Sequence, residues 1–317
     1  MDVSRRKIGG DGPDVSVLGL GSWHTYDRIP FEDAVALVRT AFDAGINVFD
    51  VGHYAWEDPR SCTDILFGRI VSAAGLARED YFHMQKVWLG DYPDEPLEHQ
   101  LDRALLRVGT DYVDMAVVNP TGEHERKPED VDVARVAREM SALIAAGKLR
   151  GWGVNHWRPS ELATLHAVTR AEGLTVPRLN QLQYTVTTRS PVEDDGFEAL
   201  LEQLGMTLQP ANVLVGGALT GREATGRAFD NPPAELRHAR ERVAPLLRQA
   251  ADRLGGTPAQ VAIAFALAHP RTTSVLFGVT RPEHLQDNIG ALALLERHGA
   301  DAVRAAVADV EPAPDER

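Results

Sequence analysis

The stretch Ile46-Asn47-Val48-Phe49-Asp50-Val51-Gly52-His53-Tyr54 decides how this chain is interpreted. An apolar run, which predicts a buried β-strand, ends in a carboxylate, an imidazole and a phenol. A second apolar run, residues 81–87, carries the ammonium group of Lys86. A phenol donates a proton to a carbonyl near neutral pH only when a nearby cation stabilises its phenolate. Asp50, Tyr54 and Lys86 together predict such a proton-donating device.

The same pattern, an apolar run followed by an amphipathic stretch, recurs along the whole chain. The expected strands are residues 15–20, 47–51, 82–87, 112–118, 149–154, 179–183, 206–210 and 274–277. Eight strands alternating with helices over about 300 residues predict an α/β fold, a (β/α)8 TIM barrel. A doubly wound sheet is the alternative, but it needs Gly-x-Gly-x-x-Gly after the first strand, and Gly19-Leu20-Gly21-Ser22-Trp23 lacks the third glycine. The stretch Gly9-Gly10-Asp11-Gly12-Pro13-Asp14 predicts a turn, so we expect an N-terminal β-hairpin cap.

The composition limits the classes of function. The chain has 317 residues, 44% of them apolar, and a net charge of -13. Nucleic-acid and membrane-surface binding need a basic face, so neither is expected. Cys62 is the only cysteine, which leaves no disulfide framework and no cysteine-based metal site. We expect a cytoplasmic protein, a monomer or small homo-oligomer, with a single barrel domain over residues 1–310 and a disordered tail over residues 311–317.

Polar or aromatic residues follow the expected strands. They are Ser22-Trp23-His24, residues 50–54, residues 86–88, Asn119, Asn155-His156-Trp157, residues 181–184, Asn212 and residues 278–281. In a barrel, the carboxyl ends of all strands meet at one mouth, where the chemistry of such folds takes place. We therefore expect the functional site at this mouth.

Over nearly its whole length the sequence resembles the aldo-keto reductases. The resemblance rests on the order and spacing of residues 15–23, 45–50, the strand with Lys86, and residues 105–114, 147–154, 180–181, 217–222 and 278–288. It implies a barrel enzyme that reduces a carbonyl compound with hydride from a nicotinamide cofactor.

The resemblance also assigns catalytic roles. Tyr54 is the expected proton donor, Lys86 lowers the pKa of the tyrosine, and Asp50 pairs with the lysine. However, Tyr54 follows Asp50 by four residues, where the family usually has five. Because of this shorter spacing, His53 and Trp56 are alternatives to Tyr54 for the position in the pocket.

Asn119 stands where the family has a histidine that orients the carbonyl. Its amide can still donate a hydrogen bond, but it cannot act as an acid or base. His124, a few residues downstream, is an alternative that is more often solvent-facing in such loops. We expect a polar or bulky substrate, such as a ring or sugar, because several tryptophans and histidines lie near the mouth.

The cofactor implied by the resemblance is NADP(H). The expected contacts are Gly21, Ser22, Trp23, Asn155, His156, Gln181, Asn212, Leu214, Gly216, Gly278, Thr280, Arg281, Asp287 and Asn288. Arg281 would pair with the 2′-phosphate and so select NADP over NAD. Ala211 replaces the aromatic residue that stacks on the nicotinamide ring, and Tyr184 or Trp23 could support the ring instead.

Two other functions remain open from the sequence. One is a redox-neutral lyase, isomerase or epimerase on the same scaffold, with His53, Tyr54 or Lys86 as the acid or base. The other is a cofactor-sensing regulatory subunit, as the channel β-subunits of the family illustrate. A metal site formed by histidines with Asp50 is not expected, because the sequence lacks a His-x-x-x-His pair.

Overall fold

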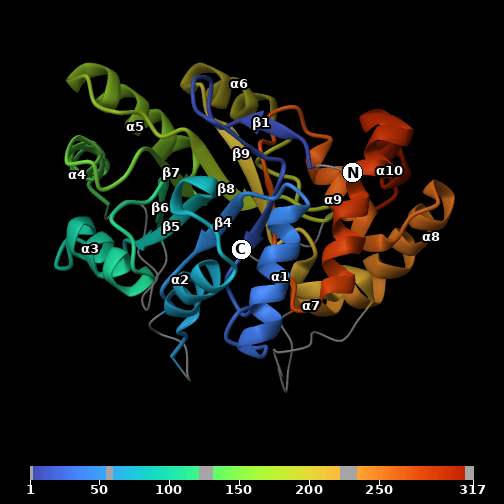
Figure 1. The fold of residues 1–317 in the computed structure, drawn as a ribbon. Coiled ribbons are helices and arrows are strands. Elements are labelled where there is room, and N and C mark those ends of the chain that lie inside the picture. Colours follow the sequence, from blue (N-terminus) through green and yellow to red (C-terminus); the bar gives the residue numbers. More distant parts are fainter. Residues whose placement is uncertain (1–2, 55–59, 121–130, 222–233, 311–317) are drawn as a thin grey trace.

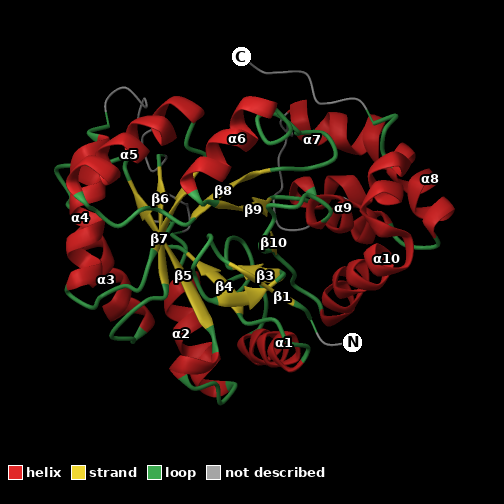
Figure 2. Cartoon of the chain, turned by 90° about the horizontal axis from the view of Figure 1, so that it is seen from above, coloured by secondary structure: helices red, strands yellow, loops and turns green. Residues whose placement is uncertain are grey.

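The structure is a computed structural model that describes residues 3–54, 60–120, 131–221 and 234–310. Eight parallel strands form one sheet in the order β10-β3-β4-β5-β6-β7-β8-β9. They are β3 (Leu18–Gly21), β4 (Val48–Val51), β5 (Phe82–Trp88), β6 (Met115–Asn119), β7 (Trp152–Asn155), β8 (Leu179–Gln183), β9 (Thr207–Ala211) and β10 (Val275–Phe277). The sheet curls until β9 meets β10, where the Leu208 N–H donates to the Arg271 carbonyl over 2.9 Å (Figure 2). The predicted (β/α)8 barrel is confirmed.

A hairpin precedes the barrel, as predicted. It pairs β1 (Arg5–Lys7) with β2 (Asp14–Ser16) in antiparallel register. The expectation of one strand over residues 15–20 is wrong, because the chain turns from β2 into β3 within this stretch. Ser16 causes the turn: its hydroxyl donates to the Leu18 carbonyl over 2.7 Å and accepts the Asn47 N–H over 3.0 Å.

Helices surround the barrel (Figure 1). They are α1 (Phe31–Asp43), α2 (Thr63–Ala73), η1 (Arg78–Asp80), α3 (Leu97–Val108), α4 (Val133–Ala145), α5 (Pro159–Glu172), α6 (Asp195–Leu204), η3 (Val215–Thr220), α7 (Ala234–His238), η4 (Ala239–Val243), α8 (Ala244–Leu254), α9 (Pro258–Leu267) and α10 (Pro282–Ala306). Within the described ranges, no helix has the length and apolar character needed to cross a bilayer.

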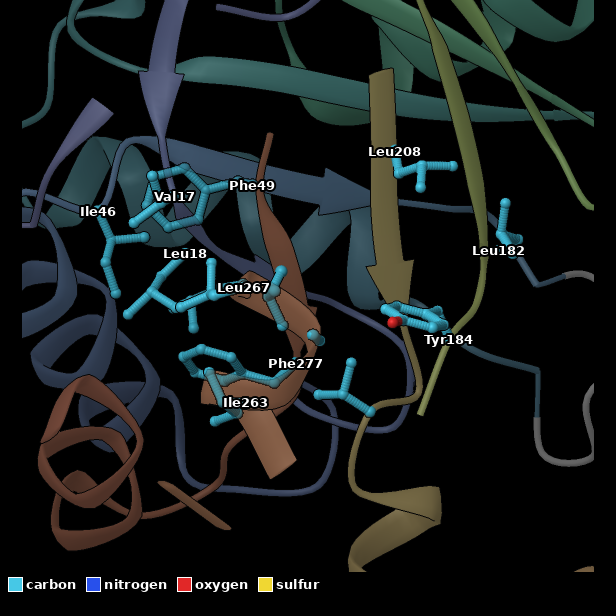
Figure 3. Close-up of a cluster of buried hydrophobic side chains, with 14 of the residues drawn as sticks. Val17, Leu18, Ile46, Phe49, Leu182, Tyr184, Leu208, Ile263, Leu267 and Phe277 are labelled. Carbon is cyan, nitrogen blue, oxygen red and sulfur yellow. The ribbon is translucent and has the colours of Figure 1, made fainter. Parts of the chain in front are cut away.

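The outer faces of the strands pack against these helices. Figure 3 shows Phe277 of β10 and Leu18 of β3 beside Ile263 and Leu267 of α9. Nearly every side chain of α9 is buried, and the helix begins with a capping box between Thr257 and its third residue, Gln260. This packing fixes the strands whose inner faces build the site.

The inner face of the barrel has two layers. The lower layer is apolar and includes side chains from the hairpin: Ile8, Val15, Val48, Phe82, Met84, Met115, Val117 and Leu179. The upper layer is polar: Asp50, Lys86, Asn119, Asn155, Gln181 and Gln209. Side chains alternate across a strand, so Val48 and Asp50, or Met84 and Lys86, face the same interior two residues apart. The hairpin closes the lower end, and the polar layer lies at the mouth.

Candidate active site

A buried ion pair lies at the centre of the upper layer. The Lys86 Nζ lies 2.9 Å from the Asp50 Oδ2, and these side chains are only 10% and 2% exposed. The structure therefore brings together the carboxylate and the ammonium group that the sequence predicted as partners. A buried charge needs a partner of opposite sign, because leaving water costs several kcal/mol per ion.

Gln181 of β8 links this pair to side chains of β7 and β9. Its Oε1 accepts hydrogen bonds from the Lys86 Nζ and, over 2.8 Å, from the Asn155 Nδ2. Its Nε2 donates to the Gln209 Oε1 over 2.7 Å. The Gln209 Nε2 in turn points to the sulfur of Met84 at 3.3 Å. This chain fixes which way the Gln181 amide is turned, because a flipped amide would place N–H groups against Lys86.

Tyr54 lies in an aromatic row at the mouth. Its ring centroid is 5.9 Å from that of Trp23 and 5.6 Å from that of Trp88. A Cβ on Gly52 would lie 2.9 Å from the Tyr54 Cζ, so only glycine leaves room for this ring. Trp88 lies on the same face of β5 as Lys86, so the aromatic row borders the strand that carries the predicted cation.

Asn119 and His53 occupy less open positions. Asn119 is 3% exposed, and its Nδ2 donates back to the Val117 carbonyl over 3.1 Å. His53 lines a small cavity against α3, together with Arg103 and Arg107. Burial, followed by the charge of Arg107, lowers the pKa of His53. Lys86 and Trp88 of β5 line the same cavity, so His53 lies between the site and α3. Trp56 and His124 lie outside the described residues.

His156 follows β7 in a left-handed backbone conformation, with φ 54°. Its N–H donates to the Gln181 carbonyl over 2.8 Å, and its side chain is exposed. Partial loss of hydration, followed by the positive charge of Lys86, lowers the pKa of His156 to about 4. The imidazole is therefore neutral at physiological pH.

The predicted cofactor residues near the first strand differ in exposure. Gly21 lies at the end of β3, and Trp23 is 46% exposed at the mouth. Ser22 is completely buried, and its hydroxyl accepts the Gly52 N–H over 3.3 Å. The Ser22 hydroxyl thus holds the ends of β3 and β4 together.

The loop after β9 has an unusual backbone. Asn212, Val215, Gly216 and Gly217 all have positive φ, and Leu214 is half-buried between them. The Asn212 Oδ1 accepts the Gly216 N–H over 3.1 Å. Positive φ costs about 1–3 kcal/mol for a residue other than glycine, and such strain gathers at functional sites.

The segment after β10 approaches the mouth closely. A Cβ on Gly278 would lie 2.9 Å from the Thr25 Cγ2, so glycine is needed there. Thr280 is half-buried, and Arg281 is exposed at the N-cap of α10.

Farther along α10, Asp287 and Asn288 differ in their contacts. The Asp287 Oδ1 accepts hydrogen bonds from Thr257 Oγ1 over 2.9 Å and from Gln260 Nε2 over 3.0 Å. Asn288 is 2% exposed, and its Nδ2 has no hydrogen-bond partner within the described residues. A buried donor of this kind usually has a partner, which makes it a candidate contact for a bound group.

Two findings go beyond the sequence prediction. Gln209 joins the site through Gln181, although nothing in its local sequence marked it. Tyr184 cannot support a nicotinamide ring, because it lies in the buried hydrophobic cluster (Figure 3). Its hydroxyl donates to the Glu193 Oε1 over 2.7 Å, and its ring packs on Phe265. Across the described segments, no three His, Cys, Asp or Glu side chains are placed to share a metal ion.

The chain belongs to the Aldo/keto reductase family, whose sequence profile matches residues 17–306. This membership supports an oxidoreductase that acts on carbonyl groups in general. Among curated proteins, the chain is 25% identical to a putative voltage-gated potassium channel subunit beta of Schizosaccharomyces pombe, over 93% of this chain and 90% of that protein. It is 27% identical to a probable subunit of the same kind from Oryza sativa subsp. japonica, over 90% of each chain.

Solved structures share the fold. A thermostable aldo-keto reductase crystallised with the inhibitor epalrestat matches with a TM-score of 0.71 and 23% identity, over 95% of this chain and 99% of that one. A putative 2,5-diketo-D-gluconic acid reductase B matches with a TM-score of 0.70 and 19% identity, over 100% of this chain and 94% of that one.

Proposed function

We propose that this protein is an NADPH-dependent reductase of small carbonyl compounds in which Tyr54 donates the proton. The observation that carries the proposal is the buried pair of Asp50 and Lys86 at the barrel mouth, with Nζ and Oδ2 2.9 Å apart. Burying two charges costs free energy. The lower layer of the same barrel is filled by apolar side chains alone, so packing does not require an ion pair. Its place beside an aromatic row that contains Tyr54 supports a proton-donating site.

The described residues fit a nicotinamide cofactor. Asn288 offers a buried donor that has no hydrogen-bond partner among the described residues, and Gly278 leaves space that a Cβ would fill against Thr25. The N-terminus of α10 and the exposed Arg281 favour a phosphate group, which supports NADP rather than NAD. The positive-φ loop from Asn212 to Gly217 would hold the pyrophosphate. The cofactor, when bound, supplies a hydride to the carbonyl carbon.

The protein's own groups would then handle the oxygen of the substrate. Tyr54 gives its hydroxyl proton to the carbonyl oxygen as negative charge develops there. Lys86 stabilises the phenolate that forms, and Asp50 holds the ammonium group in place. The exposed ring of Trp23 offers an apolar wall, which suits the ring or sugar substrate expected from the sequence.

A direct test mixes the protein with NADPH and a panel of aldehydes, ketones and sugars, and follows the absorbance of the reduced cofactor. Consumption of NADPH that Tyr54→Phe abolishes supports the proposal. Bound NADPH without turnover on any member of the panel contradicts it, and would favour the regulatory role suggested by the names of the curated relatives.

One observation favours a second candidate, a redox-neutral acid–base reaction. The Gln181 Oε1 already accepts from Lys86 and Asn155, so it is occupied by protein groups and not turned toward a carboxamide. Ala211 also lacks the ring that would stack on nicotinamide. A product of unchanged oxidation state, formed without net loss of NADPH, identifies this alternative.

The proposal extends to the cellular location, the binding partners and the oligomeric state of the protein. With a net charge of -13, the chain suits a cytoplasmic enzyme that acts on a small molecule, rather than a partner of nucleic acid or membranes. We propose a monomer or a small homo-oligomer. Sedimentation at two salt concentrations measures this state directly.

A further inference from the structure

We propose that the small cavity between β5 and α3 binds a carboxylate group of the substrate, so that the preferred substrates are carbonyl compounds that also carry an acid group. This inference rests on the proposed carbonyl reduction and names its substrate class. The cavity lies beside the proposed reaction centre, because Lys86, whose Nζ is 2.9 Å from the Asp50 Oδ2, lines it. A group held in the cavity therefore belongs to a molecule whose carbonyl lies at the mouth.

The ionisable groups that line the cavity are three cations and one imidazole. Lys86 comes from β5, Arg103 and Arg107 come from α3, and His53 follows β4. No carboxylate is found among the described residues that line the cavity. Because positive groups gather on its wall, the cavity favours a ligand of negative charge.

The carboxylates that pair with the two arginines lie outside this lining. Arg107 donates to Asp64 through Nε over 2.6 Å and through Nη2 over 2.9 Å, so its Nη1 is left to donate elsewhere. Arg103 donates to Glu95 through Nη1, which leaves the N–H groups of its Nε and Nη2. A guanidinium carries five N–H donors in a fork that matches the two oxygens of a carboxylate. The protein thus holds both arginines in place while donors remain for a ligand.

The surroundings of His53 agree with a positive cavity. Burial, followed by the charge of Arg107, lowers the pKa of its imidazole. Asp64 acts in the opposite direction, and Arg103 and Arg60 lower the pKa further. Three cations and one carboxylate therefore act on this ring. The neutral imidazole keeps one N–H that can donate to an anion.

Trp88 connects the cavity to the proposed proton donor. Its ring centroid lies 5.6 Å from that of Tyr54, and Trp88 also lines the cavity. Gln100 of α3 fixes this end of β5, because its side chain accepts the Trp88 N–H over 2.8 Å and donates to the Trp88 carbonyl over 2.8 Å. A substrate ring packed against Trp88 would extend from Tyr54 toward the arginines. This arrangement suits an aromatic aldehyde with a carboxylate at its far end.

The test compares two substrates that differ in charge, 4-carboxybenzaldehyde and its uncharged ester, methyl 4-formylbenzoate. We expect the wild type to reduce the acid with a kcat/KM about tenfold higher than that of the ester, in line with a hydrogen bond to a charged group. Arg103→Gln should lower kcat/KM for the acid about tenfold, through a higher KM, and leave that for the ester within about twofold. Arg107 is less suitable, because Asp64 is completely buried and would lose its partner.

Arg135→Gln is the matched control. Arg135 lies on α4, its side chain is 47% exposed like that of Arg103, and it also pairs with a glutamate. This variant should reduce both substrates as the wild type does. A third substrate, 4-formylphenyl phosphate, shows whether the cavity takes a carboxylate or a phosphate.

The outcomes are distinct. A preference for the acid that Arg103→Gln removes and Arg135→Gln keeps supports the inference. Equal kcat/KM for acid and ester in the wild type overturns it, as does a preference that Arg103→Gln keeps or a variant that loses both substrates equally. A higher kcat/KM for 4-formylphenyl phosphate than for the acid overturns the assignment to a carboxylate. A wild type that binds NADPH but reduces no carbonyl compound refutes the proposed function, and the inference falls with it.

Discussion

The lower and upper layers of the barrel interior come from the same strands but serve different ends. Val48 and Asp50 lie on one face of β4, two residues apart, yet the first is buried among apolar side chains and the second in an ion pair. Met84 and Lys86 repeat this contrast on β5. On each strand, two residues thus separate the part of the interior that stabilises the fold from the part that can do chemistry.

This contrast follows from how the two ends of the barrel are closed. The hairpin brings Ile8 and Val15 against the lower layer, so its side chains pack as in any core. At the mouth, polar side chains hydrogen-bond to one another through Gln181. The contrast predicts that substitutions in the two layers separate stability from activity.

The largest effect is expected from removing the buried ion pair. Lys86→Met should lower turnover about a thousandfold or more, and it should cost about 3–5 kcal/mol of unfolding free energy, because Asp50 is left charged and buried. The double variant Asp50→Asn with Lys86→Met should recover stability to within about 1 kcal/mol while staying inactive. Urea denaturation and NADPH turnover measure the two quantities. An active double variant would remove the ion pair from the mechanism.

The lower layer should respond in the opposite way. Met115 is 1% exposed, so Met115→Ala should cost about 2–5 kcal/mol of unfolding free energy through lost burial and a residual cavity. Turnover, assayed well below the unfolding transition, should stay within about twofold of the wild type, because the side chain lies beneath the polar layer. A loss of turnover at full folding would mean that the two layers are not separable.

The sequence was sufficient for the ion pair but not for the connections around it. The resemblance to the aldo-keto reductases predicted that Asp50 pairs with Lys86, and the structure places their charged atoms 2.9 Å apart. The bond between Gln181 and Gln209 depends on the register of β8 with β9, which no local pattern specifies. For that reason Gln209 was missed.

Backbone geometry explains the remaining differences. Gly52 ends the strict alternation after β4, so the sequence could not determine that His53 lies against α3 and Tyr54 against Trp88. The left-handed conformation of His156 likewise breaks the alternation after β7. Strand ends are where turns replace the regular pattern, and site residues gather there.

The outer face of β5 offers a third measurement, acid sensitivity. Burial, followed by the charge of Arg78, lowers the pKa of His83 to about 3. The unfolded imidazole binds a proton near pH 6.5, so below that pH the unfolded state holds more protons and stability falls as the pH falls. Between pH 6.5 and 5 the loss should reach about 2 kcal/mol for this residue.

His83→Gln should flatten that part of the pH profile, because the variant has no group to protonate. The comparison uses unfolding free energy from urea denaturation at pH 7, 6 and 5, in wild type and variant. Three other histidines with lowered pKa values contribute in the same direction and set the residual slope: His53, His156 and His269. Parallel profiles for the two proteins would rule out His83 as the source, and would leave the other histidines with lowered pKa values as the acid-sensitive groups.

The smallest expected effect tests whether the two layers communicate through Gln209, a positioning residue between Gln181 and Met84. Gln209→Met keeps the length of the side chain but removes the acceptor for the Gln181 Nε2, which lies 2.7 Å away. We expect about a fivefold lower kcat, in line with one hydrogen bond of about 1 kcal/mol, because the Gln181 oxygen is no longer held on Lys86. Gln209→Glu, which still accepts, should keep more activity than Gln209→Met. A double-mutant cycle on kcat with Gln181→Met separates positioning from general loosening: positioning predicts that the second substitution adds little to the first, whereas fully additive effects would show that Gln209 acts independently of Gln181.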